Sequence, residues 1–181
     1  MKFLVIDTET TWSDRVMSIG VVLSDEDMRP LESAYYVLAP EYMEGGLYSH
    51  ALSHERAKDP IVCTRHEAMQ DILNMCLKHN VTRLFAYNAL FDKSHLPELN
   101  CLEWYDIMQL AAYIQHNPMI PHWAPLYRTG RMKQGYGVES MLRILRQDWS
   151  YFETHNALLD AVDELEIMRR LGHTPETYIK L

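Results

Sequence analysis

The chain opens with a short run, residues 2–6, that is apolar after its lysine and ends in Asp7-Thr8-Glu9. Apolar and β-branched residues in a run of this length predict a buried central strand that ends among polar residues. Side chains two residues apart on a strand share one face, so the carboxylates of Asp7 and Glu9 can converge above the end of the strand. Carboxylates held that close repel each other unless a cation lies between them. The alternative is a pair of solvated acids at a strand end.

A second strand-like stretch, residues 81–87, is followed by Asn88 and then Asp92. We expect Asn88 to be the N-cap of a helix that leaves the sheet, with Asp92 in its first turn. An acid in that position can also serve only to complement the helix dipole.

The third segment, from His155 to Asp160, opens a helix that ends at Gly172. Its apolar positions recur at helical spacing, at Leu158, Ala161, Leu165, Met168 and Leu171. A histidine at a helix start and an acid on a helix surface are often inert. Here, however, the two polar residues flank apolar residues of the core, which places them near the edge of the sheet.

The rest of the sequence predicts one α/β domain that spans residues 1–181. Strands are expected at 17–23 and 32–38, as a hairpin beside the first strand, and at 83–87 and 104–106, the last of them at an edge. Helices are expected at 64–79, at 88–96, after the last strand as far as 114, and twice more. Strands that form a meander and then alternate with helices fit a single α/β core, for which 181 residues are sufficient.

Together, the three acidic segments resemble the motifs of the DEDD superfamily of 3'-to-5' exonucleases, in its DEDDh (DnaQ-like) subgroup, which includes proofreading polymerase subunits and ribonuclease T. Asp7-Thr-Glu-Thr10 is similar to the first motif, Asn88 to Asp92 to the second, and His155 to Asp160 to the third. The likeness covers nearly the whole chain, in the order and separations of that family. It implies a ribonuclease H-like three-layer α/β fold, with a central mixed β-sheet flanked by helices.

The resemblance implies a phosphodiester hydrolase that uses two Mg²⁺ or Mn²⁺ ions. Asp7 would bridge both ions, Glu9 and Asp160 would complete the site of the ion that activates the attacking water, and Asp92 would serve the other ion through water. His155 would accept the proton of that water, so we expect the rate to fall as this histidine becomes protonated. Hard divalent cations prefer oxygen ligands, in agreement with a site made of carboxylates.

The resemblance also implies contacts with the terminal nucleotide of the substrate. The expected contact residues are Thr8, Thr10, Trp12, His50, Asn88 and Phe91. Residues 49–53 are similar to a histidine-containing turn that lies beside this nucleotide in relatives, whereas a place in the core is the alternative for Phe91. The sequence departs from the family pattern at Tyr87, where a histidine often stands, at Ser18, where a glutamate often stands, and in the short segment 11–19.

The implied activity is hydrolysis of single-stranded DNA or RNA from 3' ends to 5'-mononucleotides. A catalytically weak end-binding or polymerase-docking module is a second hypothesis, but such a module is expected to have lost a ligand or the base, and none is lost here. A hydrolase of short oligonucleotides is a third. A homodimer is possible because some relatives dimerise, although no exposed apolar stripe in the sequence demands a dimer. A polymerase or repair partner is also possible.

The net charge of −8 argues against a protein that grips nucleic acid mainly through a basic surface, but not against one that binds a chain end through metal ions. We find no secretion signal and no stretch apolar enough to span a membrane, so no membrane contact is expected. Cys63, Cys76 and Cys101 fit neither a zinc spacing nor a disulfide framework, and they are expected to be reduced core residues of a cytoplasmic protein.

The least regular stretch, residues 117–137, contains prolines, aromatic residues and the cations Arg128, Arg131 and Lys133. Two interpretations have equal weight. It is a substrate lip, in which rings stack on bases and cations hold phosphates, or it is a packed surface loop. Asp106, before this stretch, is expected to be a helix cap.

Overall fold

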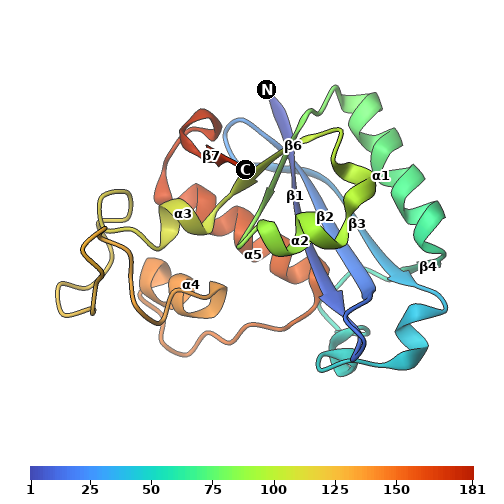
Figure 1. Cartoon of the computed structure of the whole chain (residues 1–181), viewed down its shortest axis with the longest axis horizontal. Helices are drawn as coiled ribbons and strands as arrows, with labels where there is room; N and C mark the ends of the chain where they lie inside the picture. The colour runs from blue at the N-terminus through green and yellow to red at the C-terminus, as the bar shows by residue number, and fades with distance from the viewer.

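β1 (Lys2–Thr10) is the central strand of a mixed seven-stranded sheet in this computed structural model, which describes residues 1–181 (Figure 1). The strand order is β4-β3-β2-β1-β5-β6-β7. The other strands are β2 (Val16–Asp25), β3 (Pro30–Leu38), β4 (Ile61–Cys63), β5 (Arg83–Ala86), β6 (Glu103–Asp106) and β7 (Ile179–Lys180). β1, β5 and β6 run parallel, whereas β2 is antiparallel to β1 and β3. The carboxyl ends of β1, β5 and β6 therefore lie at the same end of the sheet.

The predicted hairpin beside β1 is confirmed, with both strands longer than expected because the antiparallel pairing extends to its turn, where Ser24 pairs with Pro30. The predicted strand at 104–106 is confirmed as β6, but its expected place at the edge of the sheet is wrong. β7 pairs with β6 and forms the edge instead. β4 and β7 have no counterpart among the predicted strands, because runs of two or three residues are too short to show an alternating pattern.

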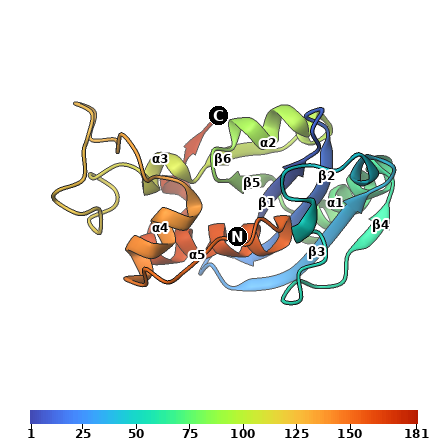
Figure 2. The same ribbon diagram turned by 90° about the horizontal axis from the view of Figure 1, so that it is seen from below.

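Helices cover both faces of the sheet (Figures 1 and 2). They are α1 (Arg65–His79), α2 (Leu90–His95), α3 (Met108–Ala111), α4 (Val138–Arg146) and α5 (Ala157–Leu171), with the short 3-10 helices η1 (Glu41–Glu44), η2 (Ser49–Ala51), η3 (Pro97–Leu99) and η4 (Pro175–Thr177). Thr64 begins α1 through a reciprocal capping box with Glu67, and Gly172 ends α5 with a φ of +71°. The helix expected to reach residue 114 ends at Ala111, because Tyr113 already pairs with Arg131 in an isolated bridge.

Asn88 is not the N-cap of α2, so this prediction is wrong. The N-cap is Ala89, and no side chain caps the helix. Asn88 instead adopts a left-handed conformation, with a φ of +58°, which asparagine tolerates better than most residues. Its N–H donates to Oδ1 of Asp106 at 3.1 Å, and the same oxygen accepts the N–H of Met108 at 3.0 Å. Asp106 therefore ties the turn after β5 to the first turn of α3.

Side chains along β1 point alternately to the two faces of the sheet, and a separate layer of the core packs on each face. Phe3 and Val5 pack with residues of α4 and α5, whereas Leu4, on the other face, packs with residues of α1. Asp7 and Glu9 continue the first of these faces, toward α5. The predicted three-layer arrangement, helices on both sides of one mixed sheet, is confirmed.

The three cysteines are free, but only Cys76 is a buried core residue. Cys63 is half-buried and Cys101 is exposed, so the core assignment is wrong for Cys101, which lies in the turn between η3 and β6. None of the helices is both long enough and apolar enough to cross a membrane.

The start of α5 lies directly against β2 at Gly20. A Cβ atom at this glycine would lie 2.2 Å from the carbonyl carbon and oxygen of Ala157 and 2.3 Å from Cα of Leu158. Gly20 is also the partner of Asp7 in the β1–β2 pairing. Only a residue without a side chain allows this approach, and the approach places the first turn of α5 beside the acidic end of β1.

We expect Gly20→Ala to lower the free energy of unfolding by about 3 kcal/mol, because its methyl group must displace helix backbone. The melting temperature should fall by about 6 to 12 °C in a chain of this size, as measured by circular dichroism. Gly137→Ala is the matched control, since no atom lies within 4 Å of a Cβ there. A wild-type melting temperature for Gly20→Ala would contradict the close packing of α5 on β2.

Candidate active site

Four acidic side chains from three elements meet at the carboxyl end of β1. Asp7 and Glu9 come from β1, Asp92 from the first turn of α2 and Asp160 from the first turn of α5. Asp92 and Asp160 are only 2% and 3% exposed. Ligand atoms of Glu9, His155 and Asp160 lie within 4.8 Å of one another. The structure thus brings together residues that are about 150 positions apart in the sequence.

Asp7 and Asp92 belong to the same buried group of charges. Oδ2 of Asp7 is covered and has no hydrogen-bond partner in the protein. Burial raises the pKa of Asp7 well above its usual range, and the neighbouring charges of Glu164 and Asp92 raise it further. Burial also raises the pKa of Asp92, although the Thr8 hydroxyl, which donates to Oδ1 of Asp92 at 2.8 Å, favours the ionised form.

Two further acids were missed by the sequence analysis: Glu164, which belongs to this group, and Glu153, whose charge acts on Asp160 from beside it. Glu164 lies one turn after Asp160 on α5, is 1% exposed, and has an Oε2 atom without a hydrogen-bond partner. Burial and the charge of Asp92 raise its pKa well above the usual range. Burial raises the pKa of Glu153 to about 7, and its charge in turn raises the pKa of Asp160. The i, i+4 spacing of Asp160 and Glu164 on an amphipathic helix is the signal that could have found Glu164.

This acidic cluster, defined as Asp7, Glu9, Asp92, Asp160 and Glu164, has no salt bridge to a lysine or arginine. Buried charges without a counter-charge are costly, and protonation or a bound cation relieves the cost. Clustered carboxylate oxygens are the ligands that Mg²⁺ and Mn²⁺ prefer. The donor set and the unpartnered oxygens therefore fit a divalent cation.

His155 lies before α5 rather than inside it, because the helix begins at Ala157 after its N-cap Asn156. The residue has a φ of +54°, and its ring stacks on the Tyr48 ring with centroids 3.8 Å apart and an angle of 16° between the planes. Burial lowers the pKa of His155, the charge of Glu139 opposes this shift, and the charge of His50 adds to it. The net effect favours a neutral imidazole, the form that can accept a proton.

Asn156 holds the segment around η2 against the start of α5. Its side-chain amide donates to the carbonyl of Ala51 at 2.8 Å and to the hydroxyl of Tyr35 at 3.0 Å, while its oxygen accepts the N–H of Leu159 at 3.3 Å. This buried network places Tyr48 and His50, which flank the start of η2, beside His155. The stacking partner Tyr48 has no motif of its own in the sequence.

The predicted substrate contacts fall into two groups. Thr8 is buried, with its hydroxyl bound to Asp92, and Thr10 is half-buried at the end of β1. The exposed residues are Trp12, His50, Asn88 and Phe91. Trp12 is 71% exposed and Phe91 40% exposed, so the alternative that places Phe91 in the core is wrong. Trp12 lies in the turn that follows β1, and Phe91 lies in the first turn of α2.

Neutralising Glu164 tests whether repulsion between the charges of the acidic cluster destabilises the folded chain. In EDTA, Glu164→Gln should raise the melting temperature by at least about 2 °C, the shift that about 1 kcal/mol produces in a chain of this size. Asp59→Asn, at an exposed acid outside the cluster, is a control for the removal of one charge.

The same repulsion gives a pH dependence with a defined sign. The folded-state pKa values are raised, to about 8 for Glu9 and about 9 for Asp160, so folded protein holds protons that unfolded protein releases above pH 4 to 5. In EDTA, the free energy of unfolding should therefore fall as pH rises between about 4 and 9. Urea denaturation across this range measures it, and a free energy that rises there would contradict the raised pKa values.

The strand order and the helices on both faces of the sheet define a ribonuclease H-like α/β fold. No protein-family model and no curated protein sequence matches the chain. Among solved structures, E. coli Exonuclease I in complex with a 5cy-dT13 oligonucleotide is similar, with a TM-score of 0.61 and 14% identity over 94% of this chain and 40% of that chain. Exonuclease I from Methylocaldum szegediense has a TM-score of 0.58 and 14% identity over 97% of this chain and 41% of that chain.

The unliganded form of Exonuclease I gives the same result, with a TM-score of 0.60 over 97% of this chain. This chain spans about two fifths of the length of these structures. At 14% identity the likeness shows the fold, and the expectation of a ribonuclease H-like fold is confirmed.

Proposed function

We propose that the chain is a metal-dependent 3'-to-5' exonuclease that hydrolyses single-stranded DNA or RNA ends to 5'-mononucleotides, and that residues 1–181 form a single exonuclease domain. The observation that carries this proposal is the convergence of Glu9, His155 and Asp160 within 4.8 Å, beside the half-buried carboxylate of Asp7 and the buried carboxylate of Asp92. A neutral imidazole next to clustered acids without counter-charges combines a proton acceptor with a cation site.

Asp7, Glu9, Asp92 and Asp160 are the residues that would hold two Mg²⁺ or Mn²⁺ ions. When bound, such ions make water a stronger nucleophile near neutral pH and stabilise the negative charge on the leaving oxygen. Thr8 fixes one oxygen of Asp92 through its hydroxyl, which leaves the second oxygen of that carboxylate for a ligand. The rigid β1 and the first turn of α5 hold the other carboxylates in place.

His155 would act as the general base. Its ring nitrogen nearest Glu9 and Asp160 would take a proton from the attacking water, the water oxygen would bond to phosphorus, and the bond from phosphorus to the 3' oxygen would break. The leaving 3' oxygen would take a proton from solvent and become the 3' hydroxyl of the shortened strand. Stacking on Tyr48 fixes the plane of the imidazole, and partial burial keeps it neutral.

Single-stranded substrates are supported by the exposed rings around the site and by the structural neighbours. E. coli Exonuclease I has been solved with the oligonucleotides dT13 and dA16. Trp12, which follows the end of β1, Phe91, which precedes Asp92, and His50 are exposed, and an unpaired base can stack on exposed rings. Because cations contact phosphates rather than base edges, we expect broad sequence tolerance.

The first experiment follows hydrolysis of single-stranded DNA and RNA that carry a label at the 5' or the 3' end, with Mg²⁺, Mn²⁺ or EDTA. We expect 5'-labelled strands to shorten one nucleotide at a time with either ion and not in EDTA. Asp7→Ala should abolish this shortening, and Asp59→Ala, at an exposed acid, is the matched control. Shortening from the 5' end, or shortening that persists in Asp7→Ala, would contradict the proposal. Turnover restricted to dinucleotides would favour the short-oligonucleotide hydrolase.

His155→Ala tests the general base separately from substrate binding. We expect kcat to fall by about 100-fold or more, because the attacking water then has no positioned proton acceptor. The Kd for an oligonucleotide, measured by fluorescence anisotropy with Ca²⁺, should stay within about 2-fold of wild type. His66→Ala, at an exposed histidine on α1, is the control. Unchanged turnover in His155→Ala would mean that another group takes the proton.

A further inference from the structure

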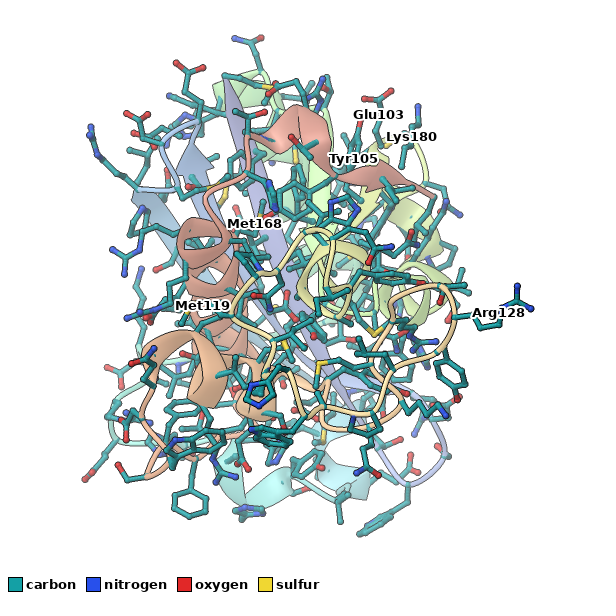
Figure 3. All side chains as sticks on the ribbon, turned by 90° about the vertical axis from the view of Figure 1, so that its left-hand side faces the viewer. Glu103, Tyr105, Met119, Arg128, Met168 and Lys180 are labelled. Atoms are coloured by element: carbon teal, nitrogen blue, oxygen red, sulfur yellow. The ribbon has the colours of Figure 1, made fainter.

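A long segment with no acidic residue projects from the body of this acidic protein. Residues 117–137 contain three cations, Arg128, Arg131 and Lys133, in a chain whose net charge is −8. None of the three makes a salt bridge. Figure 3 shows the Arg128 side chain extending away from the ribbon into solvent. The segment therefore forms a locally cationic surface.

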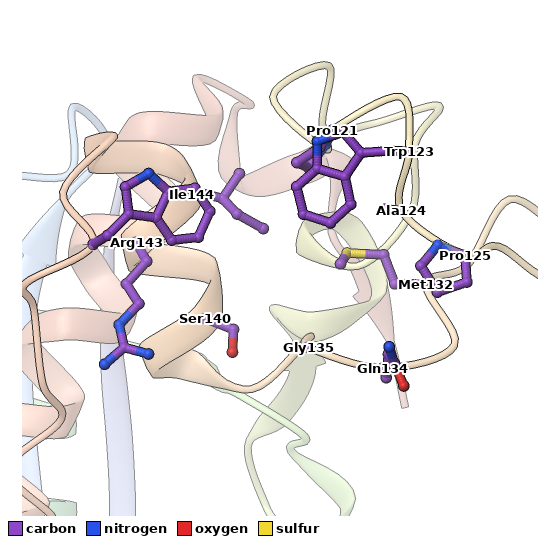
Figure 4. Close-up of a pocket in the computed structure, with 11 residues that line it drawn as sticks. Pro121, Trp123, Ala124, Pro125, Met132, Gln134, Gly135, Ser140, Arg143 and Ile144 are labelled. Carbon is purple, nitrogen blue, oxygen red and sulfur yellow. The ribbon is translucent and has the colours of Figure 1, made fainter.

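A pocket of about 180 Å³, here called the tryptophan pocket, lies between this segment and α4. Trp123 and Met132 line it from the segment, and Ser140, Arg143 and Ile144 line it from α4. Figure 4 shows Trp123 and Met132 across the pocket from Ile144. Trp149, in the turn after α4, completes the wall. The pocket is lined by indole rings and aliphatic groups, with one guanidinium at its side.

The rings at this pocket are exposed to an extent that is unusual for aromatic side chains. Trp123 is 69% exposed, Trp149 is 63% exposed, and the neighbouring Phe152 is 68% exposed. The guanidinium of Arg143 lies 4.8 Å from the centre of the Phe152 ring. Large exposed rings in one patch mark a binding surface, and rings interleaved with cations are the combination that single-stranded nucleic acids bind.

α4 connects the tryptophan pocket to the segment that precedes α5. Ser140 and Arg143 line the pocket, while Glu139, next to Ser140 on the first turn of α4, accepts the N–H of Glu153 at 3.1 Å and forms a salt bridge with Arg143 at 3.0 Å. The Tyr87 hydroxyl, in the turn after β5, donates to the carbonyl of Tyr136, near the end of the segment. α4 therefore lines the pocket, and Tyr136 and Glu139 at its start contact Tyr87 and Glu153, which lie in the segments before Asp92 and Asp160.

We propose that the tryptophan pocket binds an unpaired base of a single-stranded nucleic acid, on the 5' side of the nucleotide that is being removed. The base stacks on the indole rings of Trp123 and Trp149, and the neighbouring phosphates lie against Arg128, Arg131 and Lys133. The inference rests on the proposed function. A nucleic acid is favoured over a protein segment as the occupant because a cationic surface on an acidic chain complements a polyanion.

The binding test uses the full chain with Asp7→Ala, which separates binding from turnover. Fluorescence anisotropy gives the Kd for a fluorescein-labelled dT20 and for dT3. Adding Trp123→Ala or Trp149→Ala should weaken dT20 binding by at least about 5-fold, the loss of one stacked base, and change dT3 binding by less than 2-fold. Leu77→Ala, at an exposed apolar residue on α1, is the matched control. The conservative Trp123→Phe should keep part of the affinity.

A second arm tests the cations. Arg128→Glu with Lys133→Glu should weaken dT20 binding and flatten the dependence of log Kd on log salt concentration, because fewer phosphates are neutralised. Tryptophan variants that melt like wild type and bind dT20 with an unchanged Kd would overturn the inference and leave the pocket to a protein segment. If these variants lose dT20 affinity but the wild-type chain hydrolyses no strand, the pocket assignment stands and the proposed exonuclease activity falls.

Discussion

The contact between the start of α5 and β2 at Gly20 determines where the functional groups of this chain lie. β2 holds β1 in register, so that Gly20 stands opposite Asp7, and the helix backbone rests on the glycine with no side chain between them. His155 and Asp160, on either side of this contact, are thereby placed above the carboxylates of β1. The buried network of Asn156 extends the contact to η2 and brings Tyr48 against His155. Packing at one backbone position thus links the fold to the site.

The acidic cluster opposes the stability that this packing supplies. Burial and mutual repulsion raise the pKa values of the carboxylates from β1, α2 and α5, and no lysine or arginine neutralises them. Ionising these groups therefore costs folding free energy, which the packing of the surrounding core offsets. A bound cation would relieve this repulsion, so cation binding would raise the folding stability. Side chains that lower the folding stability in this way indicate a function, because good packing would not require acids at these positions.

The net charge of the chain and the local charge of its surfaces lead to different conclusions about binding to a nucleic acid. A net charge of −8 speaks against broad electrostatic attraction to a polyanion. Yet three of the acids, Asp92, Asp160 and Glu164, are buried in the acidic cluster, where cations would cancel their charge, while the segment 117–137 is cationic and aromatic. The sequence favoured neither a substrate lip nor a packed surface loop for residues 117–137. The exposure of Trp123 and Trp149 around one pocket favours the substrate lip.

Local signals in the sequence determined β1, the hairpin beside it, the capping box of α1 and the apolar face of α5, because strand alternation, helix periodicity and caps each depend on a few neighbouring residues. The order of the acidic motifs likewise indicated which residues meet. Only the tertiary structure decided that β4 pairs with β3 and β7 with β6. It also decided the left-handed turn at Asn88, the burial of Glu164 and the stacking of Tyr48 on His155. In each case the stabilising partner comes from a distant part of the chain, so no pattern of neighbouring residues carries the information.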